Sequence, residues 1–470
     1  MSEQFAIGAA SVRVADSAFD ARELIERVGR DLARLDGAAE WALLTWPVPR
    51  VPSERLLGAE VSGSAVLWAP PADEEACGLG AAFTLEAQGD ARLQSIQAQA
   101  QQVWSKLDVS RCDAAAPRPR FFGGLAFQPG QAESGLWRGF GDARFVLPEL
   151  SYLKNKAGAW LRLIVRGGGW DNATFRRELE PRLARALQAL FTPTPLRETA
   201  RELSREERSE SAFAELVTEI QDEIRSGHAQ KIVAARRVSL TLDRELLPEV
   251  VQSRLRDDAP ESTRFAFRVG GATFLGATPE QLLQKRGIEL STEAVAGSVS
   301  ADDATSALWL LESGKDIREH EFVVSEILRL LSPLTSELTP APKRELHRLR
   351  TVLHLRTPIT GKLRAPSHVL ELVGKLHPTP AVGGVPTRAA IDFITHHEPD
   401  QRGWYSAPFG WFDENGDGRF VVALRCGVVA GKHAELYAGA GVVADSNAPS
   451  EFAETRWKLA ALLGALGVSG

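Results

Sequence analysis

Apolar positions in the second half of the chain follow two spacings, one typical of helices and the other of strands. Apolar residues recur at helical spacing after position 211, and Gly227 stands where a left-handed residue would end that helix. The same spacing predicts helices over residues 315–331 and 449–463. Short apolar runs bounded by turn residues predict strands at KIVAARRVSL, STRFAFRV, ATFLGA, RFVVALRCGVVA and AELYAGAGVV.

The first half mixes a helical pattern, DARELIERVGRDLARL, with strand-like runs such as WALLTW and WLRLIVRGGGW. Paired glycines inside the apolar run FFGGLAF, at 121–127, predict a close backbone approach or a bulge. A polar, charged stretch follows, in which Pro193 and Pro195 force an extended backbone. We therefore divide the chain into an N-terminal part over 1–195, a linker over 196–210 and a second domain over 211–466.

The order of these elements favours one fold class. Strands outnumber helices and come in hairpin-like groups, instead of alternating one by one with helices. The pattern therefore predicts an α+β fold with antiparallel sheets and argues against a doubly wound parallel sheet.

Composition narrows the function classes. Of the 470 residues, 44% are hydrophobic and 25% are charged, and the formal net charge is -6. We do not expect nucleic acid as a partner, because its binding depends on clustered positive charge and this chain is mildly acidic. No uninterrupted apolar run is long enough for a membrane helix, and the N-terminus lacks the regions of a signal peptide. Cys77, Cys112 and Cys426 form no paired motif, so we expect reduced thiols in a soluble, cytoplasmic protein.

Two short motifs resemble a calcium-binding loop and a dinucleotide-binding fingerprint, but the residues around them do not favour either ligand. DENGDGRF resembles the first half of a calcium loop, but the position that needs a bidentate glutamate is Leu424, so a hairpin turn fits better. Gly439, Gly441 and Ala444 match a dinucleotide fingerprint, but no βαβ unit opens from them. A tight glycine turn that faces an anion is the alternative there.

Carboxylates on two predicted helices suggest a metal site. Glu451, Glu454 and Lys458 share one face of the last helix, and Glu319 lies beside His320 just before a strongly apolar helical run. On an isolated helix such charges are also typical of a solvated surface with ion pairs. Glutamate oxygens from two helices, with few His and no Cys, suit a hard ion such as Mg²⁺. His320 fits a packing role better than a ligand role.

Nine ordered blocks of sequence resemble one family. They are KIVAARRV, FLGATPEQLL, TEAVAGS, KDIREHEFV, HLRTPITGKL, LHPTPAVGGVP, EPDQRGWYSAPFGW, LRCGVVA and YAGAGVVADSNAPSEFAETRWKL. Their order is that of the chorismate-utilising enzymes, and the text is most similar to isochorismate synthases. The resemblance covers about residues 213–463, with FFGGLAF as a weaker N-terminal match.

The resemblance implies two antiparallel sheets packed face to face and flanked by helices, with the N-terminal part contributing to the same body. It implies a Mg²⁺-dependent isomerase that adds water at C2 of chorismate while the C4 hydroxyl leaves. The water-activating lysine falls on Lys231 and the general acid on Glu280. The implied metal carboxylates are Glu319 and Glu454, with Glu451 nearby. The implied substrate contacts are Gly297, Ser298, His354, Ala381, Arg425, Gly439 and Lys458.

Residue chemistry is consistent with these roles. Chorismate bears two carboxylates, so an acidic protein must supply local positive charge, which Arg425, Lys458 and a divalent ion would provide. A lysine amine acts as a base only when burial or a nearby cation favours its neutral form. Glu280 has the opposite need, because a general acid must stay protonated near neutral pH, which requires a pKa raised by desolvation.

The family also includes anthranilate, aminodeoxychorismate and salicylate synthases, and the residues argue against the first two more strongly than against the third. Anthranilate synthases typically carry Gln at the position of Lys231, and the nucleophilic lysine of aminodeoxychorismate synthases is absent from residues 294–297. We therefore expect water as the nucleophile and no amidotransferase subunit. Salicylate synthases share the lysine and are the close competitor, since Val382, where many relatives have Leu, could admit some pyruvate elimination. Whether the product serves menaquinone or a siderophore stays open.

Overall fold

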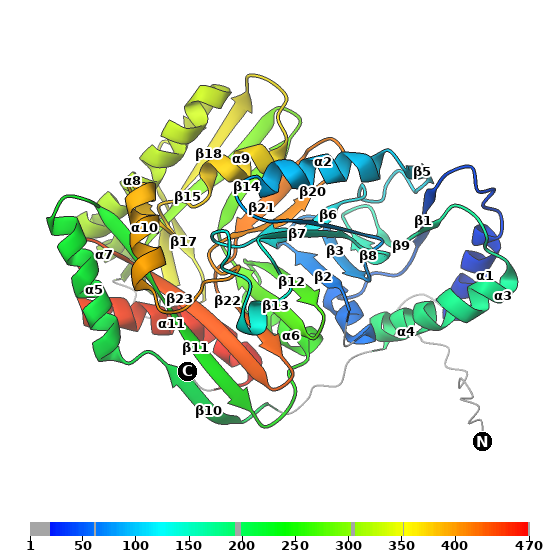
Figure 1. The fold of residues 1–470 in the computed structure, drawn as a ribbon, viewed down its shortest axis with the longest axis horizontal. Coiled ribbons are helices and arrows are strands. Elements are labelled where there is room, and N and C mark those ends of the chain that lie inside the picture. Colours follow the sequence, from blue (N-terminus) through cyan, green and yellow to red (C-terminus); the bar gives the residue numbers. More distant parts are fainter. Residues whose placement is uncertain (1–18, 61–62, 193–198, 302–305, 351, 469–470) are drawn as a thin grey trace.

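The structure, a computed structural model, describes residues 19–60, 63–192, 199–301, 306–350 and 352–468. Two large sheets form the body of the molecule, and helices lie around them (Figure 1). All strand pairs are antiparallel in the described residues except β1 with β5, which are parallel. The predicted fold class, α+β with antiparallel sheets, is confirmed.

The first sheet has 13 strands and draws them from both halves of the chain. Its strands, in spatial order, are β10 (Glu202–Glu207), β11 (Lys231–Leu242), β23 (His433–Val442), β22 (Cys426–Ala430), β13 (Ala272–Thr278), β12 (Thr263–Val269), β2 (Ala65–Ala69), β3 (Glu75–Leu79), β8 (Leu150–Lys154), β9 (Ala159–Arg166), β1 (Trp41–Pro47) and β5 (Leu107–Arg111), with β19 (Gly384–Val385) paired to β11. Strands β12 and β2 pair side by side, so one continuous sheet joins the N-terminal and C-terminal segments.

The second sheet has 10 strands. In spatial order they are β16 (Thr335–Pro340), β18 (Val352–Leu363), β15 (Glu289–Ser300), β14 (Gln281–Arg286), β21 (Gly418–Val422), β20 (Pro408–Phe412), β6 (Phe121–Leu125), β7 (Ala143–Leu147) and β4 (Phe83–Ala87), with β17 (Glu345–Arg348) paired to β18. Strand β20 pairs with β6, so this sheet also joins the two halves.

The two sheets pack face to face through an aromatic core. Phe265 and Phe274 of the first sheet and Phe409 of the second belong to one buried cluster, and the ring centroids of Phe265 and Phe409 lie 4.9 Å apart. Such aromatic pairs bury large apolar areas, so this contact fixes the spacing of the sheets over the middle of the molecule.

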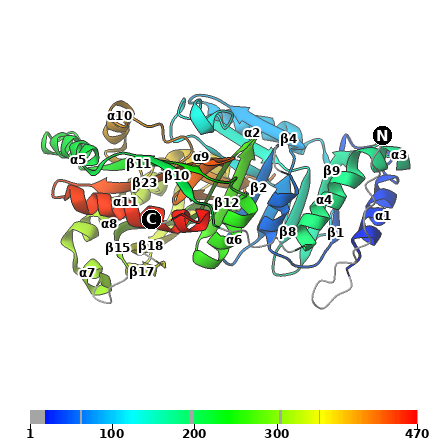
Figure 2. The same ribbon diagram turned by 90° about the horizontal axis from the view of Figure 1, so that it is seen from below.

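Helices cover the outer faces of the sheets. They are α1 (Ala21–Leu32), α2 (Arg92–Trp104), α3 (Asn172–Thr174), α4 (Glu180–Phe191), α5 (Glu210–Arg225), α6 (Pro248–Asp258), α7 (Ser306–Glu312), α8 (Gly314–Leu331), α9 (Val369–Leu376), α10 (Thr387–His397) and α11 (Ala448–Leu466). Helix α11 packs on β23, and α8 packs on β15. Seen from below, α5 and α10 lie at one end of the molecule and α1 and α3 at the other (Figure 2). Of the helices described, none combines the length and apolar character needed to cross a bilayer.

Most predicted elements are present. The helices expected over 315–331 and 449–463 are α8 and α11, and the helix after position 211 is α5, followed by Gly227 at φ 84°. The glycines of FFGGLAF lie in β6, where a Cβ on Gly123 would come 2.0 Å from the carbonyl oxygen of Arg144, so the predicted close approach is confirmed. DENGDGRF forms the β20–β21 hairpin turn, in which Asp413 accepts hydrogen bonds from the backbone of Asn415 and Asp417.

Three expectations differ from the structure. The run RFVVALRCGVVA is interrupted at Arg425, whose φ of 48° turns the chain between β21 and β22. The glycines of AELYAGAGVV lie inside β23, so the tight turn expected there is wrong. The segment predicted as a linker contains β10, which pairs with β11, while residues 196–198 of it lie outside the described residues. The division of the chain into parts 1–195 and 211–466 stays our proposal.

Candidate active site

A cavity collects side chains from both sheets and from α11. Its volume is about 60 Å³, which is below the roughly 300–1,000 Å³ typical of small-molecule sites, so it is a narrow space enclosed by polar and apolar side chains. Five of the predicted substrate contacts line it: His354, Ala381, Arg425, Gly439 and Lys458. The predicted general acid, Glu280, lines it as well. The cavity therefore brings together residues that lie almost 180 positions apart in the sequence.

Glu280 lies in the short connection between β13 and β14. Its backbone carbonyl accepts a hydrogen bond from the N–H of Val422, which ties this connection to the neighbouring strand β21. Burial, reinforced by the charge of Glu293 and opposed by Lys231 and Lys458, raises the pKa of Glu280 to about 8. The carboxyl is therefore largely protonated at neutral pH, as a general acid requires.

Lys231 begins β11 and is fully buried. Its Nζ lies 2.8 Å from Oε1 of Glu319, which projects from α8. Gly441 of β23 lies against both groups, because a Cβ there would come 2.7 Å from Glu319 Oε1 and 2.8 Å from Lys231 Cε. The predicted base and a predicted metal ligand thus form a buried ion pair, and the absence of a side chain at Gly441 leaves room for it.

Arg425 and His354 form a second pair of site residues. Nη2 of Arg425 lies 2.9 Å from Nε2 of His354, and the other ring nitrogen lies 3.0 Å from Ser298 Oγ and 3.3 Å from the carbonyl oxygen of Gly297. Burial and the charge of Arg425 hold the pKa of His354 well below its usual value, so the ring is neutral. A proton on Nδ1 would face Gly297, and Nε2 would accept from Arg425. His354 therefore fixes the direction of the guanidinium.

Gly297 and Ser298 contact the ring of His354 and do not themselves line this cavity, so their contact with substrate stays a prediction. Both were predicted to contact substrate, and in the structure they hold the ring of His354. Gly297 has φ 76°, and a Cβ there would come 3.0 Å from Asp316 of α8. These two residues support the wall of the site from β15.

Lys458 reaches the cavity from α11. Its Nζ lies 2.7 Å from Oε1 of Glu454 and donates to the carbonyl oxygen of Gly439 at 2.9 Å. Burial lowers the pKa of Arg425 to about 10, so its guanidinium stays charged at neutral pH and can attract a substrate that carries carboxylates.

The predicted metal ligands fit a hard divalent cation by their chemistry. Glu319 on α8 and Glu451 and Glu454 on α11 offer carboxylate oxygens, and Glu451 is only 2% exposed, which is unusual for a carboxylate. In the described part of the chain, no three His, Cys, Asp or Glu side chains are yet gathered as a metal cluster. Two of the three carboxylates are instead held by lysines, Glu319 by Lys231 and Glu454 by Lys458.

A buried clamp that the sequence did not reveal holds one wall of the cavity. Arg402 donates to Val382 O at 2.7 Å and to Val233 O at 2.9 Å, and it pairs with Glu398, which accepts from the N–H of Ala235. Val382 lines the cavity next to Ala381. The clamp joins β11 to the loop before β19, which no local pattern could indicate.

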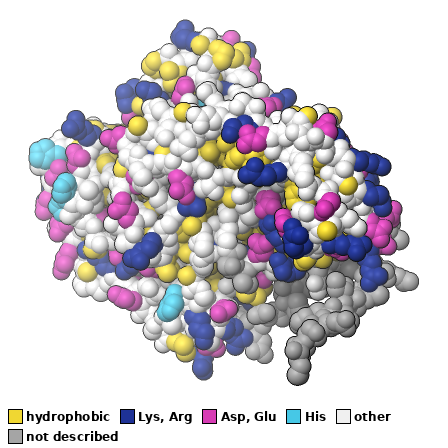
Figure 3. All heavy atoms as spheres, turned by 45° about the vertical axis from the view of Figure 1, so that its right-hand side comes forward, with side chains coloured by type: hydrophobic (Ala, Val, Ile, Leu, Met, Phe, Trp, Pro, Cys, Tyr) yellow, Lys and Arg dark blue, Asp and Glu magenta, His cyan; other side chains and the backbone are white. Residues whose placement is uncertain are grey.

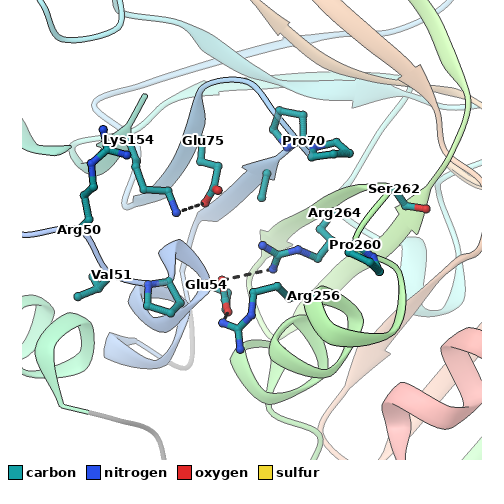
Figure 4. Close-up of a pocket in the computed structure, with 13 residues that line it drawn as sticks. Arg50, Val51, Glu54, Pro70, Glu75, Lys154, Arg256, Pro260, Ser262 and Arg264 are labelled. Carbon is teal, nitrogen blue, oxygen red and sulfur yellow. Dashed lines mark hydrogen bonds and ion pairs between the residues drawn. The ribbon is translucent and has the colours of Figure 1, made fainter. Parts of the chain in front are cut away.

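A different cavity lies beside η1 (Ser53–Ala59) and contains none of the predicted site residues (Figure 4). Its charged side chains face one another: Glu54 pairs with Arg256 and Arg264, and Glu75 pairs with Lys154. These groups satisfy each other, so the cavity lined by Glu280 is the better candidate for chemistry.

Comparisons with known proteins agree with the geometry. The family described as "Chorismate binding enzyme" matches residues 32–467, so the similarity also covers the N-terminal part that the nine sequence blocks left out. The chain is 34% identical over 358 residues to "Isochorismate synthase MenF" of Bacillus subtilis, which covers 75% of this chain and 76% of the relative. It is 34% identical over 408 residues to "Salicylate biosynthesis isochorismate synthase" of Pseudomonas aeruginosa, which covers 83% of this chain and 82% of the relative.

Solved structures share the fold. The menaquinone-specific isochorismate synthase MenF from Escherichia coli superposes with a TM-score of 0.77 at 26% identity, over 95% of this chain and all of that one. Anthranilate synthase component I from Streptococcus pneumoniae superposes with a TM-score of 0.67 at 20% identity, over 83% of this chain and 92% of that one, which indicates a shared fold alone. With the family match over 32–467 and relatives covered over most of their length, the chain belongs to the chorismate-binding enzyme family.

Proposed function

We propose that this protein is a Mg²⁺-dependent isochorismate synthase, which converts chorismate to isochorismate. One observation carries the proposal: a buried lysine and a buried, protonated glutamic acid lie within electrostatic reach of each other, beside two cations that line one cavity. Relatives whose names state this activity support it. An exchange of one hydroxyl for another needs one base and one acid, and this pair offers both.

In the proposed mechanism, Arg425 and Lys458 bind the carboxylates of chorismate, with His354 orienting the guanidinium. Lys231 takes a proton from the water that adds at C2. Glu280 gives its proton to the C4 hydroxyl, which leaves as water. Since one water enters and one leaves, the reaction is an isomerisation.

Lys231 is the proposed base, and its Nζ lies 2.8 Å from Oε1 of Glu319, one of the proposed metal ligands. Glu319, Glu451 and Glu454 would hold Mg²⁺, which when bound supplies positive charge to a substrate carboxylate and to this corner of the site.

The test is a product assay. Purified protein incubated with chorismate and Mg²⁺, without ammonia, should give isochorismate. Lys231→Ala and Glu280→Gln should each lower kcat by at least about 100-fold while chorismate still binds. Salicylate plus pyruvate as the only products would favour the salicylate synthase alternative, and no turnover would contradict the enzyme assignment.

We propose that the protein acts on a small-molecule substrate and has no macromolecular partner in this reaction. The formal net charge is -6, and basic and acidic side chains are interspersed on the face drawn in Figure 3, so we propose no nucleic-acid partner. We propose that no amidotransferase subunit is needed, since water is the nucleophile. Cys77, Cys112 and Cys426 are free thiols, which supports a reducing, cytoplasmic location. One relative's name specifies menaquinone and another's specifies salicylate biosynthesis, so the choice between menaquinone and siderophore synthesis stays open.

A further inference from the structure

The cavity contains a serine whose backbone is strained. Ser406 and Arg425 have φ values of 62° and 48°, and they are the non-glycine residues with positive φ in the described part of the chain. Both line the candidate active site. A side chain in this backbone region is unfavourable and persists only where the surrounding structure enforces it, which is characteristic of functional sites.

The neighbouring strands hold Ser406 in this conformation. Its N–H donates to Ala423 O at 2.9 Å, and the N–H of Ala423 donates back to Ala407 O at 2.9 Å. These two bonds attach the start of β20 to the end of β21, beside the turn at Arg425. The strain at both residues therefore comes from the same junction, which directs two polar side chains to one cavity.

The hydroxyl of Ser406 is buried without a well-formed hydrogen bond. The residue is 1% exposed, and among the described residues no group meets its Oγ in hydrogen-bond geometry, although the neighbouring phenol of Tyr405 lies near enough for a weak side-chain hydrogen bond. Leaving a hydroxyl unbonded in a protein interior is costly, so such groups call for an explanation. Of the polar side chains that line this cavity, those of Arg425, Lys458 and Tyr437 already have partners.

We propose that Ser406 is an additional substrate-binding residue, whose hydroxyl donates a hydrogen bond to an oxygen of bound chorismate. The inference rests on the proposed function, since it takes chorismate as the ligand. Bound substrate completes the bonding of a hydroxyl that the folded protein leaves without a well-formed hydrogen bond. Because the bond is present in the ground state, Ser406 contributes to affinity more than to turnover.

Two substitutions separate the hydroxyl from the backbone. Ser406→Ala removes the oxygen and keeps Cβ, whereas Ser406→Gly also removes the cause of strain, because glycine adopts this φ freely. Ser262→Ala is the matched control, since Ser262 is also buried with an unpartnered Oγ but lines the other cavity (Figure 4). All three variants are checked for folding by thermal unfolding.

Chorismate binding is measured by calorimetry without Mg²⁺, and KM and kcat are measured with it. Both Ser406 variants should raise Kd and KM by about 3- to 30-fold, the range of one hydrogen bond, with kcat changed less than KM. Ser262→Ala should leave all three values unchanged. A Ser406→Ala variant with wild-type Kd and KM would overturn the inference, and so would an effect in Ser406→Gly alone. Binding of chorismate without turnover would contradict the proposed function, while the ratio of Kd values would still decide the role of Ser406.

Discussion

At the scale of single residues, the site depends on burying ionisable groups whose charged forms are more stable in water. Glu280 responds by keeping its proton, whereas Lys231 keeps a carboxylate beside it. The proposed acid and the proposed base therefore have different environments within one cavity region.

Glu280 should set the alkaline limit of activity. With a pKa of about 8 in the free protein, Glu280 is protonated below that value, so kcat/KM should fall as the pH rises through about 8. A rate profile between pH 6 and 10 measures this limb. An alkaline limb near pH 10, with no change near 8, would contradict the role of Glu280.

Ionisation of the Glu280 carboxyl should lower the free energy of unfolding at high pH. Because its folded pKa is raised, the folded state binds the proton more tightly than the unfolded chain does, and stability is lost as the pH rises toward about 8. Glu280→Gln removes this dependence, so the inactive variant should unfold at a higher temperature than the wild type at pH 9. Near pH 5 the difference should be smaller, and thermal scans at both pH values provide the comparison.

Gly441 should tolerate no side chain. A Cβ there would come within 3 Å of both Lys231 and Glu319, so Gly441→Ala should separate the ion pair and lower kcat at least about tenfold, with a loss of about 1–3 kcal/mol in the free energy of unfolding. Gly464→Ala in α11 is the control, because nothing lies within 4 Å of its Cβ position. That change should keep activity and stabilise the helix by about 0.5–1 kcal/mol. Equal activity in both variants would contradict the packing argument.

At the scale of elements, the site is assembled by contacts between segments that no local signal connects. The clamp of Arg402 and Glu398 is the clearest case, because it fastens β11 to the loop that carries Ala381 and Val382. The side chains of Arg402 and Glu398 are at most 5% exposed, so neither charge can be solvated by water if its partner is removed.

Removing one member of this pair should therefore be severe. Arg402→Met should lower the free energy of unfolding by about 3–5 kcal/mol, because it leaves the Glu398 carboxylate buried without its cation. The double variant Arg402→Met, Glu398→Gln should recover part of that loss. Urea titrations of the single and double variants measure the coupling, and a fully additive pair would contradict it. In the single variant KM should rise, since the wall at Val382 loses its support.

At the scale of the whole molecule, the metal is expected to serve chemistry and not folding. The two sheets share a continuous aromatic core, and Glu319 and Glu454 each form an ion pair with a lysine, Lys231 and Lys458 respectively, so neither carboxylate relies on a metal ion alone for a nearby cation. Chelation by EDTA should therefore abolish turnover while the protein stays folded. Adding Mg²⁺ back should restore activity and raise the unfolding temperature only by what binding to the native state contributes.

Glu454→Gln provides the matched variant for this experiment. It keeps the size of the side chain and removes a charge from the proposed metal site, so more Mg²⁺ should be needed for half-maximal rate. Unfolding during chelation, or a wild-type requirement for Mg²⁺ in this variant, would contradict the assignment.

The sequence by itself determined the class of fold, most of the elements and the chemical type of the site. Apolar spacing identified α5, α8 and α11, because helical periodicity depends on local sequence. The base at Lys231 and the acid at Glu280 came from the resemblance of nine sequence blocks to one family, and these two roles stay predictions. Burial raises the pKa of Glu280, which is the direction that its implied role as a general acid requires.

Only the tertiary structure decided which residues touch. In the structure, Gly297 and Ser298 contact His354, and Glu319 pairs with Lys231. The segment predicted as a linker contains strand β10, and Ser406 lines the cavity. These facts depend on sheet pairings and on positive φ values that are imposed from outside the segment. A spacing rule records neighbours along the chain, whereas burial and ion pairing depend on neighbours in space.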